Sequence, residues 1–207
     1  MNIRDIVLRG VPGVLALLLS ACTMSQVSLD YQPGLAQVVK GRPVFSVGRF
    51  VNARGVESYY LGVVRTPVGT PLEYIRTRMP VEEVVRNAFT HACSTRDMLT
   101  TRPKSTYIIT GEVLELSCQQ LVHPYAYARL RMNVVKASTG EIIFTRTYAG
   151  ERQAPAYRPG SGSPVPLLRD LASRALQDAV DRALDDPEFR GRIRNMGASS
   201  YYQPGML

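Results

Sequence analysis

The segment "YAYARLRMNVVKASTGEIIFTRTY", residues 125–148, alternates small or apolar residues with polar or aromatic ones, as half-buried β-strands do. One face of its first half carries Ala126, Ala128, Leu130, Met132 and Val134. The other face carries Tyr125, Tyr127, Arg129, Arg131 and Asn133. Ser138-Thr139-Gly140 supplies a turn, and residues 141–148 return beside the first half. We therefore predict an antiparallel hairpin with one face in the core.

Further strands and a helix precede this hairpin. Residues 105–118 predict a strand with Gly111 as a bulge or a point of close packing. Residues 42–51 and 58–65 are rich in β-branched and aromatic residues and flank the turn-like Asn52-Ala53-Arg54-Gly55, which predicts a second hairpin. Between these strands a helix is expected to begin at Pro80. Its apolar stripe comprises Val81, Val84, Val85, Ala88, Phe89 and Ala92.

A loop, a second helix and a tail follow the hairpin. Residues 152–166 contain four prolines and two glycines, which predicts a loop. The second helix is expected to end at Asp186-Pro187. Its apolar stripe comprises Leu167, Leu168, Leu171, Ala172, Ala175, Leu176, Ala179, Val180, Ala183 and Leu184. Residues 195–207 are expected to form a flexible tail.

These elements define the fold class. Their order is β-β-α-β-β-β-α, and each helix offers one apolar stripe to a sheet. We predict an α+β fold, in which two helices pack on one face of a mainly antiparallel sheet. The chain has 207 residues, of which 45% are hydrophobic, so one domain over residues 42–194 can bury an ordinary core.

The N-terminus predicts export. Arg4 and Arg9 precede an apolar run over residues 11–19, and Ser20 and Ala21 follow it. This is the charged region, apolar region and small-residue cleavage site of a signal peptide, here residues 1–21. The apolar run is far shorter than the ~20 residues that a membrane-spanning helix needs.

Leu19-Ser20-Ala21-Cys22 resembles the lipobox of bacterial lipoproteins. The resemblance implies cleavage before Cys22 and a covalent lipid on its thiol, with acyl chains that anchor the protein in membrane lipid. Thr23 stands where an aspartate would favour the inner membrane in such lipoproteins, so we expect the periplasmic face of the outer membrane. Residues 22–41 are expected to form a lipidated tether. The alternative is a secreted protein with an incidental cysteine.

Little in the sequence supports catalysis. His91 and His123 are the only histidines, and His91 and Cys93 point to different sides of a helix, so we predict no metal site, no cofactor beyond the lipid and no enzyme. The net charge is +8, but the basic residues are scattered, and export argues against a nucleic acid partner. Cys93 and Cys118 are expected to stay unpaired, because a straight strand would carry Cys118 far from the first helix.

The order of elements resembles the YajG-type lipoproteins and the auxiliary lipoproteins of ABC transport systems. The residues that carry the resemblance are "ACSTRDMLTTRPKSTYIITGEVLEL", "VVKASTGEIIFTRTYAGE" and the closing helix "LLRDLASRALQDAVDRALDDPEFRGRI". More distantly, the pattern is similar to the amino-terminal domain of TolB and the periplasmic domain of CsgG. The resemblance implies a non-enzymatic envelope protein that docks to other proteins, and it supplies no catalytic residue.

Tyr125, Tyr127, Arg129 and Arg131 form the candidate partner surface, since aromatic and arginine side chains are frequent at interface hot spots. An ordinary polar sheet face is the alternative for these residues. For the whole protein we expect an accessory or adaptor in envelope assembly or transport. The alternative is a lipoprotein that binds peptidoglycan or activates a cell-wall synthase. The sequence identifies neither the envelope partner nor the oligomeric state.

Overall fold

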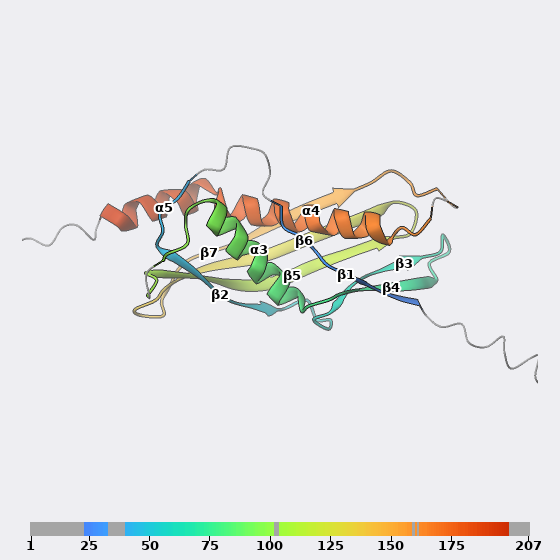
Figure 1. The fold of residues 1–207 in the computed structure, drawn as a ribbon, viewed down its shortest axis with the longest axis horizontal. Coiled ribbons are helices and arrows are strands. Elements are labelled where there is room, and N and C mark those ends of the chain that lie inside the picture. The colour runs from blue at the N-terminus through green and yellow to red at the C-terminus, as the bar shows by residue number, and fades with distance from the viewer. Residues whose placement is uncertain (1–22, 33–39, 102–103, 159, 161, 199–207) are drawn as a thin grey trace, which may run out of the picture.

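The computed structural model describes residues 23–32, 40–101, 104–158, 160 and 162–198. Over these residues a seven-stranded sheet is covered on one face by helices, and the long axis follows the strands (Figure 1). The strand order is β1-β4-β3-β5-β6-β7, and β2 also pairs with β5. The fold is therefore α+β, as predicted, but the sheet is mixed and the order of elements differs.

The centre of the sheet is an antiparallel meander of β5 (Tyr107–Gln120), β6 (Pro124–Lys136) and β7 (Ile142–Gln153). The predicted hairpin of residues 125–148 is confirmed, with both strands longer than expected. The alternation holds as well, because the five apolar residues of β6 from Ala126 to Val134 are all buried. At Gly111 an added Cβ would lie 2.0 Å from the carbonyl oxygen of Arg131, so this is a point of close packing.

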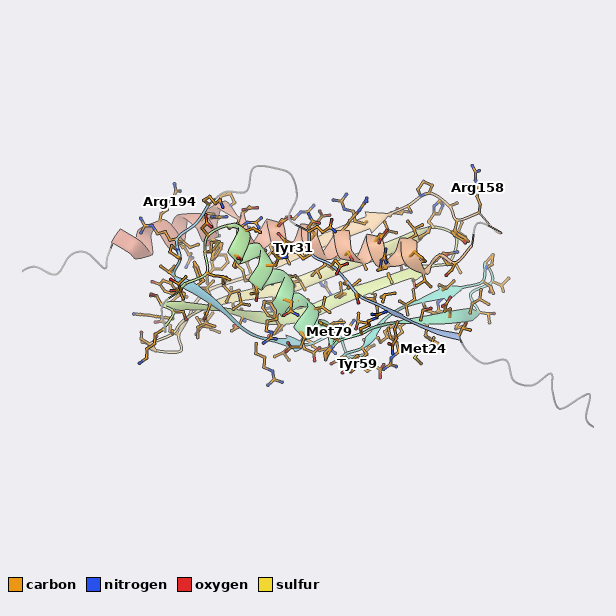
Figure 2. The ribbon with its side chains drawn as sticks, viewed as in Figure 1. Met24, Tyr31, Tyr59, Met79, Arg158 and Arg194 are labelled. Atoms are coloured by element: carbon orange, nitrogen blue, oxygen red, sulfur yellow. The ribbon has the colours of Figure 1, made fainter. Side chains whose placement is uncertain are left out.

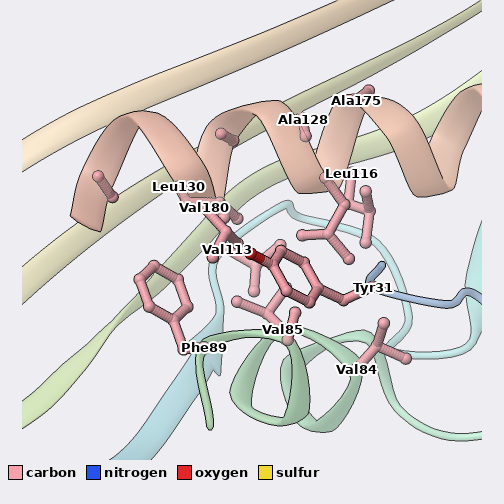
Figure 3. Close-up of a cluster of buried hydrophobic side chains, with 14 of the residues drawn as sticks. Tyr31, Val84, Val85, Phe89, Val113, Leu116, Ala128, Leu130, Ala175 and Val180 are labelled. Carbon is pink, nitrogen blue, oxygen red and sulfur yellow. The ribbon is translucent and has the colours of Figure 1, made fainter. Parts of the chain in front are cut away.

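The two predicted helices are α3 (Val81–Thr95) and α4 (Val165–Leu184), and both cover the same face of the sheet (Figure 1). α4 approaches β7 so closely that a Cβ at Gly150 would lie 2.1 Å from the carbonyl oxygen of Ala175. Buried side chains of both helices meet those of β5 and β6 between the layers, where Val85, Phe89, Leu130 and Val180 gather (Figure 3). The apolar stripes predicted for the two helices thus form the core, except for Leu167, which is exposed on α4.

The predicted hairpin of residues 42–51 and 58–65 is wrong. β2 (Phe45–Asn52) and β3 (Tyr60–Arg65) do not pair with each other, and both run parallel to β5 along the same edge. β2 pairs with the first half of β5, and β3 pairs with its last residues. β4 (Pro71–Thr77), which the sequence reading missed, then runs antiparallel to β3.

Arg54 explains why the turn-like residues 52–55 do not close a hairpin. Its guanidinium donates to the carbonyl oxygens of Leu116, Tyr60 and Glu57 at 2.7, 2.8 and 2.9 Å. Leu116 is the part of β5 that lies between its pairing with β2 and its pairing with β3. Arg54 therefore satisfies backbone groups that neither strand reaches. Burial lowers the pKa of Arg54, against the opposing effect of nearby Glu82.

The tether predicted for residues 22–41 is also wrong over residues 23–32. β1 (Thr23–Val27) pairs in parallel with β4 at the edge of the sheet, and Val27 and Tyr31 are buried in the core. An open edge of β4 offers backbone hydrogen bonds that a polar segment can take without an alternating pattern. Likewise α5 (Pro187–Ala198) extends four residues into the predicted tail 195–207, and the rest of that tail lies outside the described residues.

Candidate docking face

The predicted partner residues lie on the sheet face that the helices leave open, which we call the outer face. Along β6 the buried residues alternate with Tyr125 and Tyr127, which are half-buried, and with Arg129 and Arg131, which are exposed. Because α3 and α4 pack on the buried side, all four side chains project to the other side of the sheet. The structure therefore brings the four predicted residues together on one open surface.

The outer face is not a basic stripe, because each arginine has an acidic neighbour on β5. The register sets Arg131 opposite Glu112 and Arg129 opposite Glu115. Arg131 Nη1 lies 2.8 Å from Glu112 Oε2, while Arg129 Nη2 lies 3.9 Å from Glu115 Oε2. The sequence reading missed both glutamates. They are three residues apart in "GEVLELS", so strict alternation would set them on opposite faces, and only the irregularity between Val113 and Glu115 puts both beside the arginines.

Tyr125 belongs to a line of residues that crosses the whole sheet. In strand order the paired residues are Met24, Tyr74, Val63, Gln119, Tyr125 and Gln153. The Tyr60 and Tyr74 rings lie 6.5 Å apart, and Gln119 contacts the Tyr125 hydroxyl. The outer face thus has an aromatic and apolar part near this line and an ion-paired part further along β5 and β6.

A buried charge cluster fixes residues 23–32 to the body. Arg96, which is 2% exposed, donates to Asp185 Oδ2 at 2.6 Å, to Asp181 Oδ1 at 3.0 Å and to the Tyr31 hydroxyl at 3.2 Å. Tyr31 in turn donates to Asp181 Oδ1 at 2.5 Å. Figure 2 shows Tyr31 between α3 and α4. The cluster joins the N-terminal segment to the end of α3 and to α4, and thereby determines where the chain enters the fold.

The electrostatics of this cluster are those of a closed structural site. Burial, and then the hydrogen bond to Asp181, raise the pKa of Tyr31. Burial would also raise the pKa of Asp185, but the hydrogen bonds and charges of Arg96 and Arg190 outweigh it and lower that pKa. The raised pKa of Arg96 and the lowered pKa of Asp185 keep both of these groups ionised near neutral pH. We therefore assign the cluster a role in stability.

The other candidate reactive groups are dispersed. Cys93 and Cys118 are free thiols in the core, and burial raises the pKa of each to about 12. The His91 ring lies 5.6 Å from that of Tyr31. Within the described ranges no group of histidine, cysteine, aspartate and glutamate side chains could hold a metal ion. A polar pocket lies beside Asp30 and α4. Two charged residues of its lining, Arg169 and Asp170, form an ion pair with each other.

The predicted cleavage and lipidation residues, Leu19, Ser20, Ala21 and Cys22, lie outside the described residues. In the part of the chain that the structure describes, no helix combines the length and apolar character needed to cross a bilayer.

Comparison with known proteins supports the fold. No family profile matches the sequence, and no curated protein matches it. A crystal structure of a Xanthomonas campestris protein of the family DUF330 is similar to it, with 16% identity and a TM-score of 0.61 over 84% of this chain and 99% of the other. A minor lipoprotein from Acinetobacter baumannii is similar with 11% identity and a TM-score of 0.38, over 69% of this chain and 95% of the other. The first likeness shows that this arrangement of strands and helices occurs in a solved bacterial protein.

Proposed function

We propose that this chain is a non-enzymatic lipoprotein, anchored through a lipid on Cys22 at the periplasmic face of the outer membrane. It acts as an accessory or adaptor in envelope assembly or transport by docking its outer face to an envelope protein. One observation carries the docking step. The outer face sets Tyr125, Tyr127, Arg129 and Arg131 together on a side of the sheet that neither helix covers.

The composition of the outer face favours a protein partner. Tyrosine and arginine combine large contact area with directed hydrogen bonding, which makes them frequent at interface hot spots. Glu112 and Glu115 lie beside the two arginines and balance their charge. A balanced, aromatic surface suits a folded partner with complementary polar groups.

The alternative, a lipoprotein that binds peptidoglycan or activates a cell-wall synthase, has less support. An acidic polymer would be attracted by uncompensated positive charge, whereas Arg129 and Arg131 each have an acidic neighbour. A protein that reaches from the membrane to the cell wall also needs a long linker. Residues 23–27 already form a strand of the sheet, which removes much of the reach that a tether over residues 22–41 would give.

Charge reversal on the outer face tests the docking step. Full-length protein carrying Arg129→Glu and Arg131→Glu should fold normally but lose most crosslinking to its partner in cells. A matched control reverses two exposed arginines of α4 on the other side of the molecule, Arg169→Glu and Arg174→Glu. Crosslinks should persist in this control. Unchanged crosslinks in the outer-face variant would contradict docking through the outer face. Capture of the wild-type protein on purified sacculi, lost in the outer-face variant, would support cell-wall binding in place of the adaptor function.

The anchor is tested separately. Radioactive palmitate should label the wild-type protein and leave a Cys22→Ser variant unlabelled. The variant should also leave the outer-membrane fraction, because acyl chains buried in lipid supply the attachment. An unlabelled wild-type protein, or a Cys22→Ser protein that still fractionates with outer membranes, would contradict lipid anchoring.

A further inference from the structure

Exposed apolar side chains gather at the end of the molecule where the described chain begins. Val68, in the turn between β3 and β4, is 88% exposed, while Met24 of β1 and Leu72 of β4 are 59% and 52% exposed. Thr23 Oγ1 donates to the carbonyl oxygen of Leu72 at 3.3 Å, and Met24 pairs with Tyr74. These apolar residues thus surround the start of β1, and Figure 2 shows Met24 at that end.

A second turn adds to the same end. Leu121 and Val122 lie between β5 and β6 and are 40% and 50% exposed. β3 pairs with the last residues of β5, so this turn lies beside the end of β3. Figure 1 shows the β3–β4 turn, the β5–β6 turn and the beginning of β1 at one end of the long axis. We call Met24, Val68, Leu72, Leu121 and Val122 the apolar end.

The predicted lipid anchor would lie directly beside the apolar end. Cys22 directly precedes Thr23, which already pairs with Glu73 in the sheet. Consecutive Cα atoms are about 3.8 Å apart, so a lipid on Cys22 holds this end of the sheet within a few ångströms of the bilayer surface. No flexible linker separates Cys22 from β1. The side chains nearest the anchor are therefore presented to lipid at very high effective concentration.

We propose that the apolar end rests in the headgroup region of the bilayer, with Met24, Val68 and Leu72 as the inserted side chains. The inference depends on the lipid that the proposed function places on Cys22. We assign a phospholipid surface as the partner of the apolar end, because the lipid on Cys22 keeps the bilayer surface next to the apolar end at all times. Apolar side chains leave water when they enter the interface, which favours this orientation.

This orientation leaves the ion-paired part of the outer face free. The strands run away from the apolar end along the long axis of the molecule (Figure 1). Arg131 follows Tyr125 by six residues along β6, which is about 20 Å of extended chain. Membrane contact at the apolar end and docking at the ion-paired part of the outer face can therefore occur together.

Site-specific fluorescence tests the inference in the full lipidated protein. A nitrobenzoxadiazole label is attached at Val68→Cys or, as the matched control, at Ile142→Cys. Ile142 is 57% exposed and begins β7 at the opposite end of the sheet. Cys93 and Cys118 are buried with raised pKa values, so the introduced cysteine reacts selectively. The protein is reconstituted in vesicles of phosphatidylethanolamine and phosphatidylglycerol that contain a nitroxide-labelled lipid.

We expect the label at residue 68 to shift its emission to the blue and to be quenched several-fold more strongly than the label at residue 142. Equal quenching at the two positions in lipidated, vesicle-bound protein would overturn the inference and leave the anchor intact. Mass spectrometry of the N-terminal peptide is done on the same samples. A peptide without lipid would overturn the inference together with the anchor that it depends on.

Discussion

The two faces of the sheet differ in the interactions that their side chains make. The inner face is packed with small and branched side chains under α3 and α4, and Leu130 and Val113 there are fully buried (Figure 3). The residues that alternate with them along β5 and β6 point to the outer face, and these are tyrosines and partly exposed ion pairs such as Arg131–Glu112. Burial of apolar surface is the main favourable term in folding, while exposed ion pairs add little. Stability should therefore depend on the inner face, which leaves the outer face free for recognition.

The largest contrast is expected between two adjacent residues of β6. Leu130→Ala should lower the free energy of unfolding by about 2–5 kcal/mol, because it opens a cavity beneath α4. Arg129→Ala on the outer face should change it by less than about 0.5 kcal/mol. Urea unfolding followed by circular dichroism measures both. Similar losses for the two variants would mean that the faces are not energetically distinct.

The second prediction concerns the buried charge cluster around Arg96. Arg96→Met keeps much of the side-chain volume but leaves Asp181 and Asp185 without their shared partner. Both carboxylates are about a third exposed, so we expect a loss of about 2–3 kcal/mol, below the ~3–5 kcal/mol of a fully buried pair. Hydrogen exchange at residues 24–31 should also accelerate, because Tyr31 loses one of its two partners. Unchanged exchange there would show that the cluster does not hold the N-terminal segment.

The third prediction concerns stability in acid. Asp186 accepts from the backbone N–H groups of Glu188 and Phe189 at the start of α5 and from the Tyr148 hydroxyl. Burial would raise its pKa, but these hydrogen bonds and the charge of Arg146 outweigh burial and lower it. A carboxylate with a lowered pKa in the folded state stabilises the protein above its unfolded pKa of about 3.9. That contribution is lost as the pH falls through the folded value.

Asp186→Asn isolates this effect, since asparagine still caps a helix but does not titrate. We expect a loss of about 1 kcal/mol at pH 7 and a smaller decrease in stability between pH 5 and pH 2 than in the wild type. Urea unfolding at a series of pH values measures the free energy of unfolding of both proteins as a function of pH. Parallel pH profiles for the two proteins would contradict the role of Asp186.

The meander and the N-terminal half differ in how far the sequence predicts them. In residues 125–148 the pattern, the turn and the pairing are all local, so alternation was enough. β2 and β3 instead pair with β5, far along the chain, and Arg54 satisfies the backbone between them. Residues 23–27 have no alternating pattern, and only the open edge of β4 makes them a strand. Pairing between distant strands depends on the whole sheet, so the sequence of one segment does not specify its partner strand.

The candidate site was predicted in part for the same reason. Alternation along β6 was enough to place Tyr125, Tyr127, Arg129 and Arg131 on the open side. It did not show that Glu112 and Glu115 face the arginines, because that depends on the register between β5 and β6, including the irregularity between Val113 and Glu115. The apolar end was not predicted either. Val68 and Leu72 become neighbours of Met24 only through the unforeseen pairing of β1 with β4.

The smallest expected effect concerns the ion pair that best represents the outer face. Arg131 and Glu112 lie 2.8 Å apart, yet their side chains are 44% and 34% exposed, so water screens much of their attraction. In a double-mutant cycle with Arg131→Ala and Glu112→Ala we expect a coupling energy below about 1 kcal/mol, which falls further in 0.5 M salt. The same single variants should weaken partner crosslinking measurably. A coupling energy as large as the loss at Leu130 would make the pair a structural element and would remove the reason to assign recognition to this face.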